Sequence, residues 1–246
     1  MKKIWLVGAS EGIGRDLAIK LAKDGNVLAL SARSKERIDS LITELSGSGH
    51  INIPLDASNM ASITAAWEKI VAEFKNLDTV IYNAGFYLPN ALENLDLTAI
   101  EKMHDVNFTG AIRVLSQCLP HFLQNDSGHI AVVGSVAGYS GLPNALGYAS
   151  SKAALINFLE SMKCDLKGRN IKLQIINPGF VKTRLTQQNS FKMPFLIPSE
   201  EAAEHIVSGL KKNCFEIHFP WQFSYFLKFL RLLPYSLYFK IISKTK

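Results

Sequence analysis

The stretch GYASSKAAL, residues 147–155, holds two side chains whose types and spacing could do chemistry. Tyr148 lies four residues before Lys152, and residues four apart share one face of a helix. A phenol with a pKa of about 10 is a poor base at neutral pH, and a cation within about 4–6 Å favours its ionised form. The pair therefore predicts a proton-transferring Tyr148 tuned by Lys152. Such pairs are also common on ordinary helix surfaces, so other motifs must decide between the two interpretations.

A glycine-rich turn near the N-terminus predicts a phosphate-binding loop. Gly8, Gly12 and Gly14 follow a short apolar run in the stretch GASEGIG, and a helical pattern comes next. Glycines let the backbone approach a pyrophosphate, and the free N–H groups of the following helix attract it. The spacing is GxxxGxG rather than GxGxxG, and no GK[ST] follows, which argues against an ATP or GTP loop. The other residues assigned to this loop are Ser10, Glu11 and Ile13.

The end of the second apolar run indicates which dinucleotide is bound. An acidic residue at this point binds the ribose 2′-hydroxyl of NAD, whereas an Arg accommodates the 2′-phosphate of NADP. The run ends in LSARS, which places Arg33 and Ser34 there, and the nearest acid is Glu36. A guanidinium forms bidentate bonds to phosphate. We therefore expect NADP, with NAD as the less favoured cofactor. The alternative is that Arg33 is a solvated loop residue.

Elements that would position these residues alternate along the chain. Short apolar runs and longer segments of helical periodicity follow one another, which predicts an α/β fold with a doubly wound, mainly parallel sheet of seven strands and helices on both faces. We expect one domain over residues 1–246. The predicted strands are Lys3–Val7, Asn26–Ser31, Ile51–Leu55, Thr79–Tyr82, His129–Val133, Lys172–Ile176 and Glu216–Phe219. The predicted helices are Ile13–Lys23, Lys35–Leu45, Met60–Lys75, Leu97–Leu123, Ala149–Lys167 and Ser199–Lys212.

The composition excludes several classes of protein. The three cysteines are far apart and form no metal-binding spacing, so we expect no metal site and a cytoplasmic location with reduced thiols. The apolar run that begins at Ile4 is too short for a signal peptide. The net charge of +6 lies entirely after residue 210, where seven Lys and Arg accompany one Glu. The remaining 210 residues are neutral, which argues against nucleic-acid binding.

Seven motifs between Ile4 and Thr183 resemble those of the short-chain dehydrogenase/reductase family. In order they are GASEGIG, LDAS, YNAG, VNFTG, VVGSVAG, YASSK and NPGFVKT. Val7 stands where the family usually has Thr, and Tyr82 precedes the NAG motif, but no catalytic position departs. The resemblance implies a Rossmann-like fold, an NAD(P) cofactor, and a homo-oligomer, either a dimer or a tetramer. It assigns further cofactor contacts to Asp56, Ala57, Asn83, Ala84, Gly85, Pro178, Gly179, Val181 and Thr183, and also to Tyr148 and Lys152.

The resemblance also implies the reaction, a hydride transfer between the cofactor and a carbonyl or secondary alcohol. Tyr148 would be the acid in reduction and the base in oxidation. Ser135 would hold the substrate oxygen, and Asn107 would hold a water that passes protons to Lys152. Each has a simpler interpretation: Ser135 as a turn residue, Asn107 as a helix kink or a satisfied core amide, and Asp56 as a helix N-cap. The motif VGSVAG lacks the GxSxG pattern of a serine hydrolase.

Two C-terminal segments point to the substrate. Residues 184–198 are irregular and apolar, which predicts a lid over a lipophilic substrate. Residues 220–246 form an aromatic and basic extension without a run long enough to span a membrane. Three interpretations of the extension stay open: packing or a subunit contact, a peripheral membrane contact, and a partner protein. For the whole chain, the alternative to an oxidoreductase is a non-catalytic NADP sensor or membrane-surface scaffold.

Overall fold

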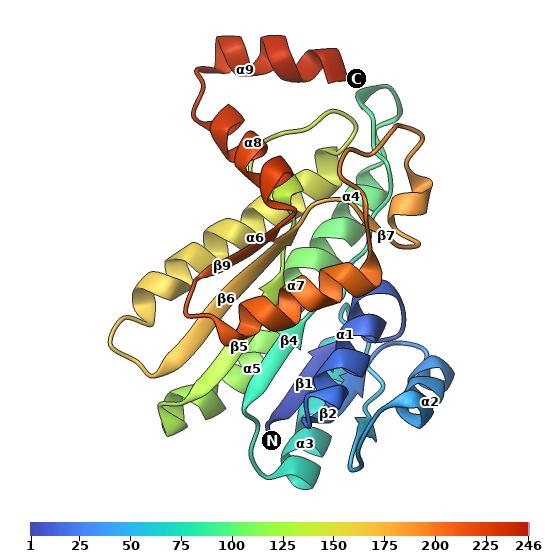
Figure 1. Cartoon of the computed structure of the whole chain (residues 1–246), viewed down its shortest axis with the longest axis vertical. Coiled ribbons are helices and arrows are strands. Elements are labelled where there is room, and N and C mark those ends of the chain that lie inside the picture. Colours follow the sequence, from blue (N-terminus) through green and yellow to red (C-terminus); the bar gives the residue numbers. More distant parts are fainter. Residues whose placement is uncertain (246) are drawn as a thin grey trace.

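A parallel sheet of seven strands forms the centre of the computed structural model, which describes residues 1–245. The strand order is β3-β2-β1-β4-β5-β6-β9, and every neighbouring pair in it is parallel (Figure 1). The order reverses between β1 and β4, and ligands bind at such a switch point, beyond the carboxyl ends of the strands. The strands are β1 Lys3–Val7, β2 Val27–Ser31, β3 Ile51–Asn52, β4 Thr79–Tyr82, β5 Gly128–Val133, β6 Ile171–Pro178 and β9 Glu216–Phe219.

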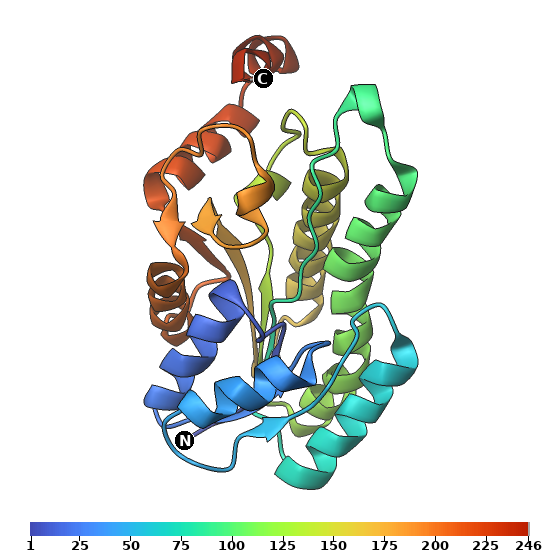
Figure 2. The ribbon, with the colours of Figure 1, turned by 90° about the vertical axis from the view of Figure 1, so that its right-hand side faces the viewer.

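Helices cover both faces of the sheet (Figure 2), which confirms the predicted doubly wound α/β fold. α1 (Gly12–Lys23), α2 (Lys35–Glu44) and α7 (Ser199–Lys211) pack on one face. α3 (Met60–Phe74), α5 (Gly110–Asn125) and α6 (Leu146–Asp165) pack on the other, and α4 (Leu97–His104) packs beside α6.

The sequence of strand β1 is almost continuously apolar because both of its faces are buried. Side chains alternate between the two faces of a strand. Trp5 and Val7 lie in the core between the sheet and α3, α5 and α6, whereas Ile4 and Leu6 lie in the core on the opposite face. Because both faces are covered, the alternation of polar and apolar residues that marks a half-exposed strand is absent.

The helix predicted over Leu97–Leu123 is interrupted. α4 ends at His104, a π-helical segment spans Asp105–Thr109, and α5 begins at Gly110. A π-helical insertion widens the helix by one residue per turn and is frequent at functional sites. The segment contains Asn107, so the interruption positions one of the predicted catalytic residues.

The C-terminal part contains elements that periodicity alone did not delimit. Short strands β7 (Val181–Lys182) and β8 (Ile197–Pro198) pair in parallel and enclose residues 183–196, so the predicted irregular segment 184–198 ends in a strand. The extension forms α8 (Trp221–Arg231) and α9 (Tyr235–Ile242), which separate at Pro234 because proline cannot continue a helix. The last residue of the predicted extension, Lys246, lies outside the described residues. Short 3₁₀ turns occur at Leu92–Asn94, Val136–Gly138, Thr186–Gln188 and Ser243–Thr245.

Candidate active site

A cavity of about 570 Å³ opens at the carboxyl ends of β1, β4, β5 and β6, at the switch point of the sheet. Nearly all residues predicted for catalysis or cofactor binding line it. They are Gly8, Ser10, Glu11, Gly12, Ile13, Arg33, Asp56, Ala57, Asn83, Ala84, Gly85, Ser135, Tyr148, Lys152, Pro178, Gly179, Val181 and Thr183. Gly14, Ser34 and Asn107 are the three predicted residues that do not line it.

The glycine-rich loop is built so that side chains would not fit. Gly8 has φ +87°, and a Cβ there would lie 2.5 Å from the backbone nitrogen of Ala84. A Cβ on Gly14 would lie 2.0 Å from the carbonyl oxygen of Gly8, which also accepts a bond from Asn83 at 2.8 Å. Helix α1 begins directly after Glu11, whose side chain makes no capping bond to the described backbone. The first amides of α1 are therefore available to an anion, as a dinucleotide pyrophosphate requires.

Asp56 lines the cavity and does not cap a helix. Its Oδ1 accepts bonds from the backbone N–H of Ser58 at 2.9 Å and from the Ser58 hydroxyl at 2.6 Å. These bonds hold the pKa of the Asp56 carboxyl below its usual range. Helix α3 is capped instead by Asn59, so the N-cap alternative for Asp56 is wrong.

Arg33 and Ser34, which follow strand β2, have different surroundings. Arg33 is exposed and lines the cavity, whereas the Ser34 hydroxyl caps α2 by accepting the N–H of Arg37 at 3.3 Å. Glu11 of the glycine-rich loop pairs with Arg37 at 2.7 Å and with Arg184 at 3.6 Å. Arg33, Lys102 and Arg184 all line the cavity. Arg33 stays the predicted phosphate ligand, whereas the Ser34 hydroxyl caps α2.

Tyr148 and Ser135 both line the cavity, and the Ser135 side chain is near enough to the phenol to lower its pKa. Ser135 follows β5, and its Oγ accepts the N–H of Ala137 at 3.1 Å, so it is a turn residue as well. The Tyr148 ring packs edge-on against Tyr87, with centroids 5.1 Å apart. Burial raises the pKa of Tyr148 to about 12, although the Ser135 side chain lowers it. The phenol is therefore protonated at neutral pH and ready to act as an acid.

Lys152 lies one helical turn from Tyr148, but its ammonium donates to a backbone carbonyl at the end of β5. Its Nζ donates to the carbonyl oxygen of Val133 at 2.8 Å and lies 5.8 Å from the centroid of the Tyr148 ring. Burial lowers the pKa of Lys152 to about 8. In the chain without cofactor, burial is the largest influence on the pKa of Tyr148 and raises it. That Lys152 favours the phenolate in the reaction stays a prediction.

Asn107 is fully buried in the π-helical segment, and both of its polar side-chain atoms are engaged. Its Oδ1 accepts the N–H of Phe86 at 2.7 Å, and its Nδ2 donates to the Phe86 carbonyl at 2.9 Å and to Ser151 at 3.0 Å. Ser151 in turn donates to the carbonyl of Tyr148 at 2.8 Å. The side chain of Asn107 therefore positions α6, the helix that carries Tyr148, and the kink and satisfied-amide interpretations both apply. Sequence reasoning gave Ser151 no role.

A family comparison agrees with this geometry. Residues 2–193 match the family model described as short chain dehydrogenase. The chain belongs to the short-chain dehydrogenase family. An uncharacterized oxidoreductase of Myxococcus xanthus is 34% identical over 95% of this chain and 93% of its own. The 11-beta-hydroxysteroid dehydrogenase 1A of Arabidopsis thaliana is 32% identical over an alignment that covers 77% of this chain and 55% of that relative. The solved structure of an alcohol dehydrogenase from the archaeon Thermococcus sibiricus complexed with 5-hydroxy-NADP superposes with a TM-score of 0.79 at 26% identity, covering 89% of this chain and 95% of that one.

Membership in the short-chain dehydrogenase family makes the chain an NAD(P)-dependent oxidoreductase that interconverts carbonyls and alcohols. The residues present fit that cofactor, because the loop at Gly8 and Gly14 leaves no room for side chains and the first amides of α1 are available to its phosphates. Which residues act in the reaction is a proposal that follows from the contacts above.

Sequence reasoning missed residues of this short-chain dehydrogenase that join residues 184–198 to side chains of the cavity. Tyr87 is the clearest: its hydroxyl donates to Asn189 at 2.7 Å, and its carbonyl accepts Gln188 at 3.1 Å. Tyr87 therefore joins residues 184–198 to the ring of Tyr148. No motif marks it, and its position two residues after the NAG motif is the one signal that could have found it.

We expect the affinity for NADPH to fall as the pH rises through about 8. The Lys152 amine is charged below its lowered pKa and neutral above it, and the anionic cofactor favours the charged form. If binding raises that pKa by one unit, the affinity falls about tenfold across the titration. Titration of protein fluorescence with NADPH between pH 6.5 and pH 10 would measure this, each pH being about half a unit apart. In Lys152→Met the step near pH 8 should vanish; an unchanged step would assign it to another group.

Proposed function

We propose that this short-chain dehydrogenase is an NADP-preferring reductase or dehydrogenase that acts on lipophilic carbonyls or secondary alcohols. The observation that carries the proposal is that Ser135 and Tyr148 line the same cavity as the glycine-rich loop. A phosphate-binding loop at one end and a proton donor at the other are what a hydride transfer from a dinucleotide requires. The proposed homo-oligomer rests on family membership alone.

The chain's own residues supply the proton and the electrostatics of the proposed reaction. Bound NADPH supplies the hydride, which goes to the carbonyl carbon. Tyr148 gives its phenolic proton to the carbonyl oxygen, and Ser135 donates a hydrogen bond to the same oxygen while negative charge grows there. The Lys152 ammonium then favours the phenolate that Tyr148 becomes. In alcohol oxidation the same atoms move in reverse, and the phenolate removes the hydroxyl proton.

Arg33 supports NADP over NAD because it is exposed and lines the adenosine end of the cavity. We expect Arg33→Ala to raise the KM for NADPH by about 10- to 100-fold and to leave the KM for NADH nearly unchanged, since charged hydrogen bonds contribute about 1.5–3 kcal/mol. Steady-state kinetics with both cofactors measures this. Lys35→Ala is the control, a neighbouring cation that does not line the cavity. Equal losses with both cofactors in Arg33→Ala would remove the argument for NADP.

A group of aromatic rings around residues 184–198 supports a lipophilic substrate. Phe180 follows the NPG motif and contacts Phe191 and Phe223, with ring centroids 5.7 Å and 5.5 Å apart. Phe195 lies 6.1 Å from Phe223. Two of these rings belong to residues 184–198, which we propose as the substrate lid. The Arabidopsis relative is a hydroxysteroid dehydrogenase by name, which is consistent with an apolar substrate.

A panel of carbonyl compounds that differ in chain length tests the proposal directly. Each is incubated with NADPH and, in parallel, with NADH, and cofactor oxidation is followed by absorbance. Turnover that increases with apolar chain length and prefers NADPH supports the proposal. Binding of NADPH without turnover of any compound would favour a cofactor sensor instead.

Tyr87→Phe is expected to loosen the proposed lid without disturbing the chemistry. The phenyl ring keeps its packing against Tyr148, but the bond to Asn189 is lost. The KM for the carbonyl should rise about 3- to 10-fold, as loss of one hydrogen bond of about 1 kcal/mol implies, with a nearly constant kcat. Asn189→Ala should have the same effect, and the double variant should add little to either. Additive effects would mean that the two side chains act independently.

A further inference from the structure

The outer surface of helices α8 and α9 is apolar, although these helices also bury apolar residues inward. Phe223, Leu227 and Leu230 of α8 and Tyr238 and Ile242 of α9 pack into the core. A helix on the surface of a globular protein normally turns polar residues outward. Here the outward residues, which we call the tail surface, include Trp221, Tyr225, Phe226, Phe229, Leu232, Tyr235, Leu237, Phe239 and Ile241, all at least 41% exposed.

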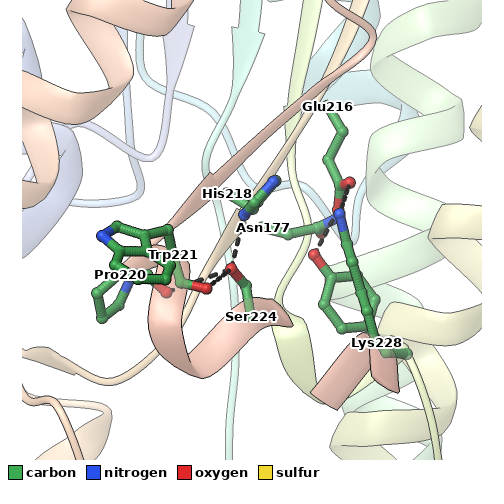
Figure 3. A network of polar contacts seen from close by, with 8 residues as sticks. Asn177, Glu216, His218, Pro220, Trp221, Ser224 and Lys228 are labelled. Atoms are coloured by element: carbon green, nitrogen blue, oxygen red, sulfur yellow. Dashed lines mark hydrogen bonds and ion pairs between the residues drawn. The ribbon is translucent and has the colours of Figure 1, made fainter. Parts of the chain in front are cut away.

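Polar contacts hold helices α8 and α9, which carry the tail surface, against the rest of the domain. In Figure 3, Lys228 of α8 and Asn177 of β6 converge on the Glu216 carboxylate of β9. Lys228 forms an ion pair with Glu216, and Asn177 donates to it at 2.7 Å. The Tyr238 hydroxyl of α9 donates to the carbonyl of Gly141. These anchors hold both helices in place and leave their outward apolar side chains exposed.

The charge of this segment is one-sided. The sequence after Glu216 contains no Asp or Glu, and Glu216 is itself paired with Lys228. Arg231, Lys240 and Lys244 are exposed among the aromatic residues of the tail surface. Aromatic rings mixed with cations, without acids, are the composition of helices that lie in the headgroup region of an anionic bilayer. Two tail surfaces facing each other would instead bring like charges together, which disfavours a second copy of the chain as the occupant.

The tail surface also adjoins the active site. Helix α8 begins directly after β9, at the edge of the sheet where the cavity opens, and Figure 1 shows α8 and α9 at that end. A Cβ on Gly179, which lines the cavity, would lie 3.1 Å from the ring of Phe223. Residues 184–198 add exposed apolar side chains beside it, since Phe195 lies 6.1 Å from Phe223. These side chains are Phe191, Phe195 and Leu196.

We propose that the tail surface docks on an anionic lipid bilayer and that lipophilic substrate enters the cavity from the lipid side. Over residues 1–245 no helix has the length and apolar character to cross a membrane, so the contact is peripheral. The docking step rests on the tail surface alone. The entry step rests in addition on the proposed function, because it needs a lipophilic substrate.

Vesicle flotation with matched charge variants tests the docking. The full chain is mixed with vesicles of phosphatidylcholine, with and without phosphatidylglycerol. We expect it to float with the anionic vesicles and to lose binding at high salt. The triple variant Arg231→Glu, Lys240→Glu, Lys244→Glu should bind the anionic vesicles at least about 100-fold more weakly than the wild type. The control Lys163→Glu, Lys167→Glu, Arg169→Glu makes the same change in net charge at the α6–β6 turn, at the opposite end of the sheet, and should bind like the wild type.

A second pair of variants tests the apolar part and the competing occupant. Phe229→Ser with Leu232→Ser changes two exposed side chains and should also abolish flotation. Light scattering on each variant reports its oligomeric state. No flotation of the wild type, equal loss in the control triple, or tail variants that change the oligomeric state without affecting flotation would each overturn the proposal.

Activity on a water-soluble carbonyl separates this proposal from the proposed function. The tail variants should keep that activity while losing vesicle binding and turnover of a carbonyl dissolved in vesicles. Tyr148→Phe should do the opposite, floating like the wild type without turnover. If the wild type turns over no carbonyl but floats, the docking holds and the entry step fails with the proposed function.

Discussion

Replacing Tyr148 with Phe is expected to lower kcat for carbonyl reduction by about 10²- to 10⁴-fold while NADPH still binds. Phe keeps the ring and its edge-on packing against Tyr87 but removes the phenolic hydroxyl. The carbonyl oxygen then keeps the hydrogen bond from Ser135 but loses its proposed proton donor, so its proton would come from water. The fold should be preserved, because the substitution removes one oxygen and no apolar contact.

Single-turnover kinetics under saturating NADPH isolates the chemical step of this variant. Tyr139→Phe is the matched control, because Tyr139 is a buried tyrosine that does not line the active-site cavity and whose hydroxyl donates to Glu216. We expect it to affect stability more than the rate of hydride transfer. Rates within about tenfold of the wild type in Tyr148→Phe would exclude it as the acid. Ser135→Ala should then be tested in its place.

The sequence predicted the frame of the site because that frame depends on local patterns. Each strand reads as a short apolar run bounded by helical periodicity, and the parallel arrangement follows from the alternation. The glycine-rich loop and Ser135 each follow a strand, so the topology alone brings them to one edge of the sheet. Tyr148 was predictable for a related reason: its helix packs beside that edge.

Other features of the site depend on contacts between distant residues, which periodicity does not encode. The apolar spacing continues through Asp105–Thr109, so nothing local announced the π-helical segment. The hydrogen bonds that join Asn107 of this segment to Phe86 and to Ser151 connect residues that are 21 and 44 positions apart in the sequence. The raised pKa of Tyr148 was not predictable for a similar reason. The spacing shows that Lys152 is near, but only the packing shows that its ammonium is bonded to Val133.

Gly14→Ala is expected to disrupt the cofactor site more than its single added methyl group suggests. The Cβ would lie 2.0 Å from the carbonyl oxygen of Gly8 and 2.6 Å from the Nδ2 of Asn83. These atoms form the bond that joins the loop to the strand end after β4, so the backbone of the loop must move. Overpacking of this kind costs about 1–3 kcal/mol of folding free energy. A displacement of about 1 Å in a site costs on the order of 10²-fold in rate, so kcat/KM for NADPH should fall by about that factor.

Gly141→Ala is the matched control for this variant. A Cβ at Gly141 meets no heavy atom of the described chain within 4 Å, and its φ is outside the left-handed region. Restricting the unfolded chain there should leave stability unchanged or raise it by about 0.4–1 kcal/mol. Denaturant unfolding and NADPH titration compare the two variants. If Gly14→Ala binds NADPH as tightly as Gly141→Ala does, the close contact between the loop and α1 is not needed for binding. The pyrophosphate would then have to be held by residues beyond the glycine-rich loop.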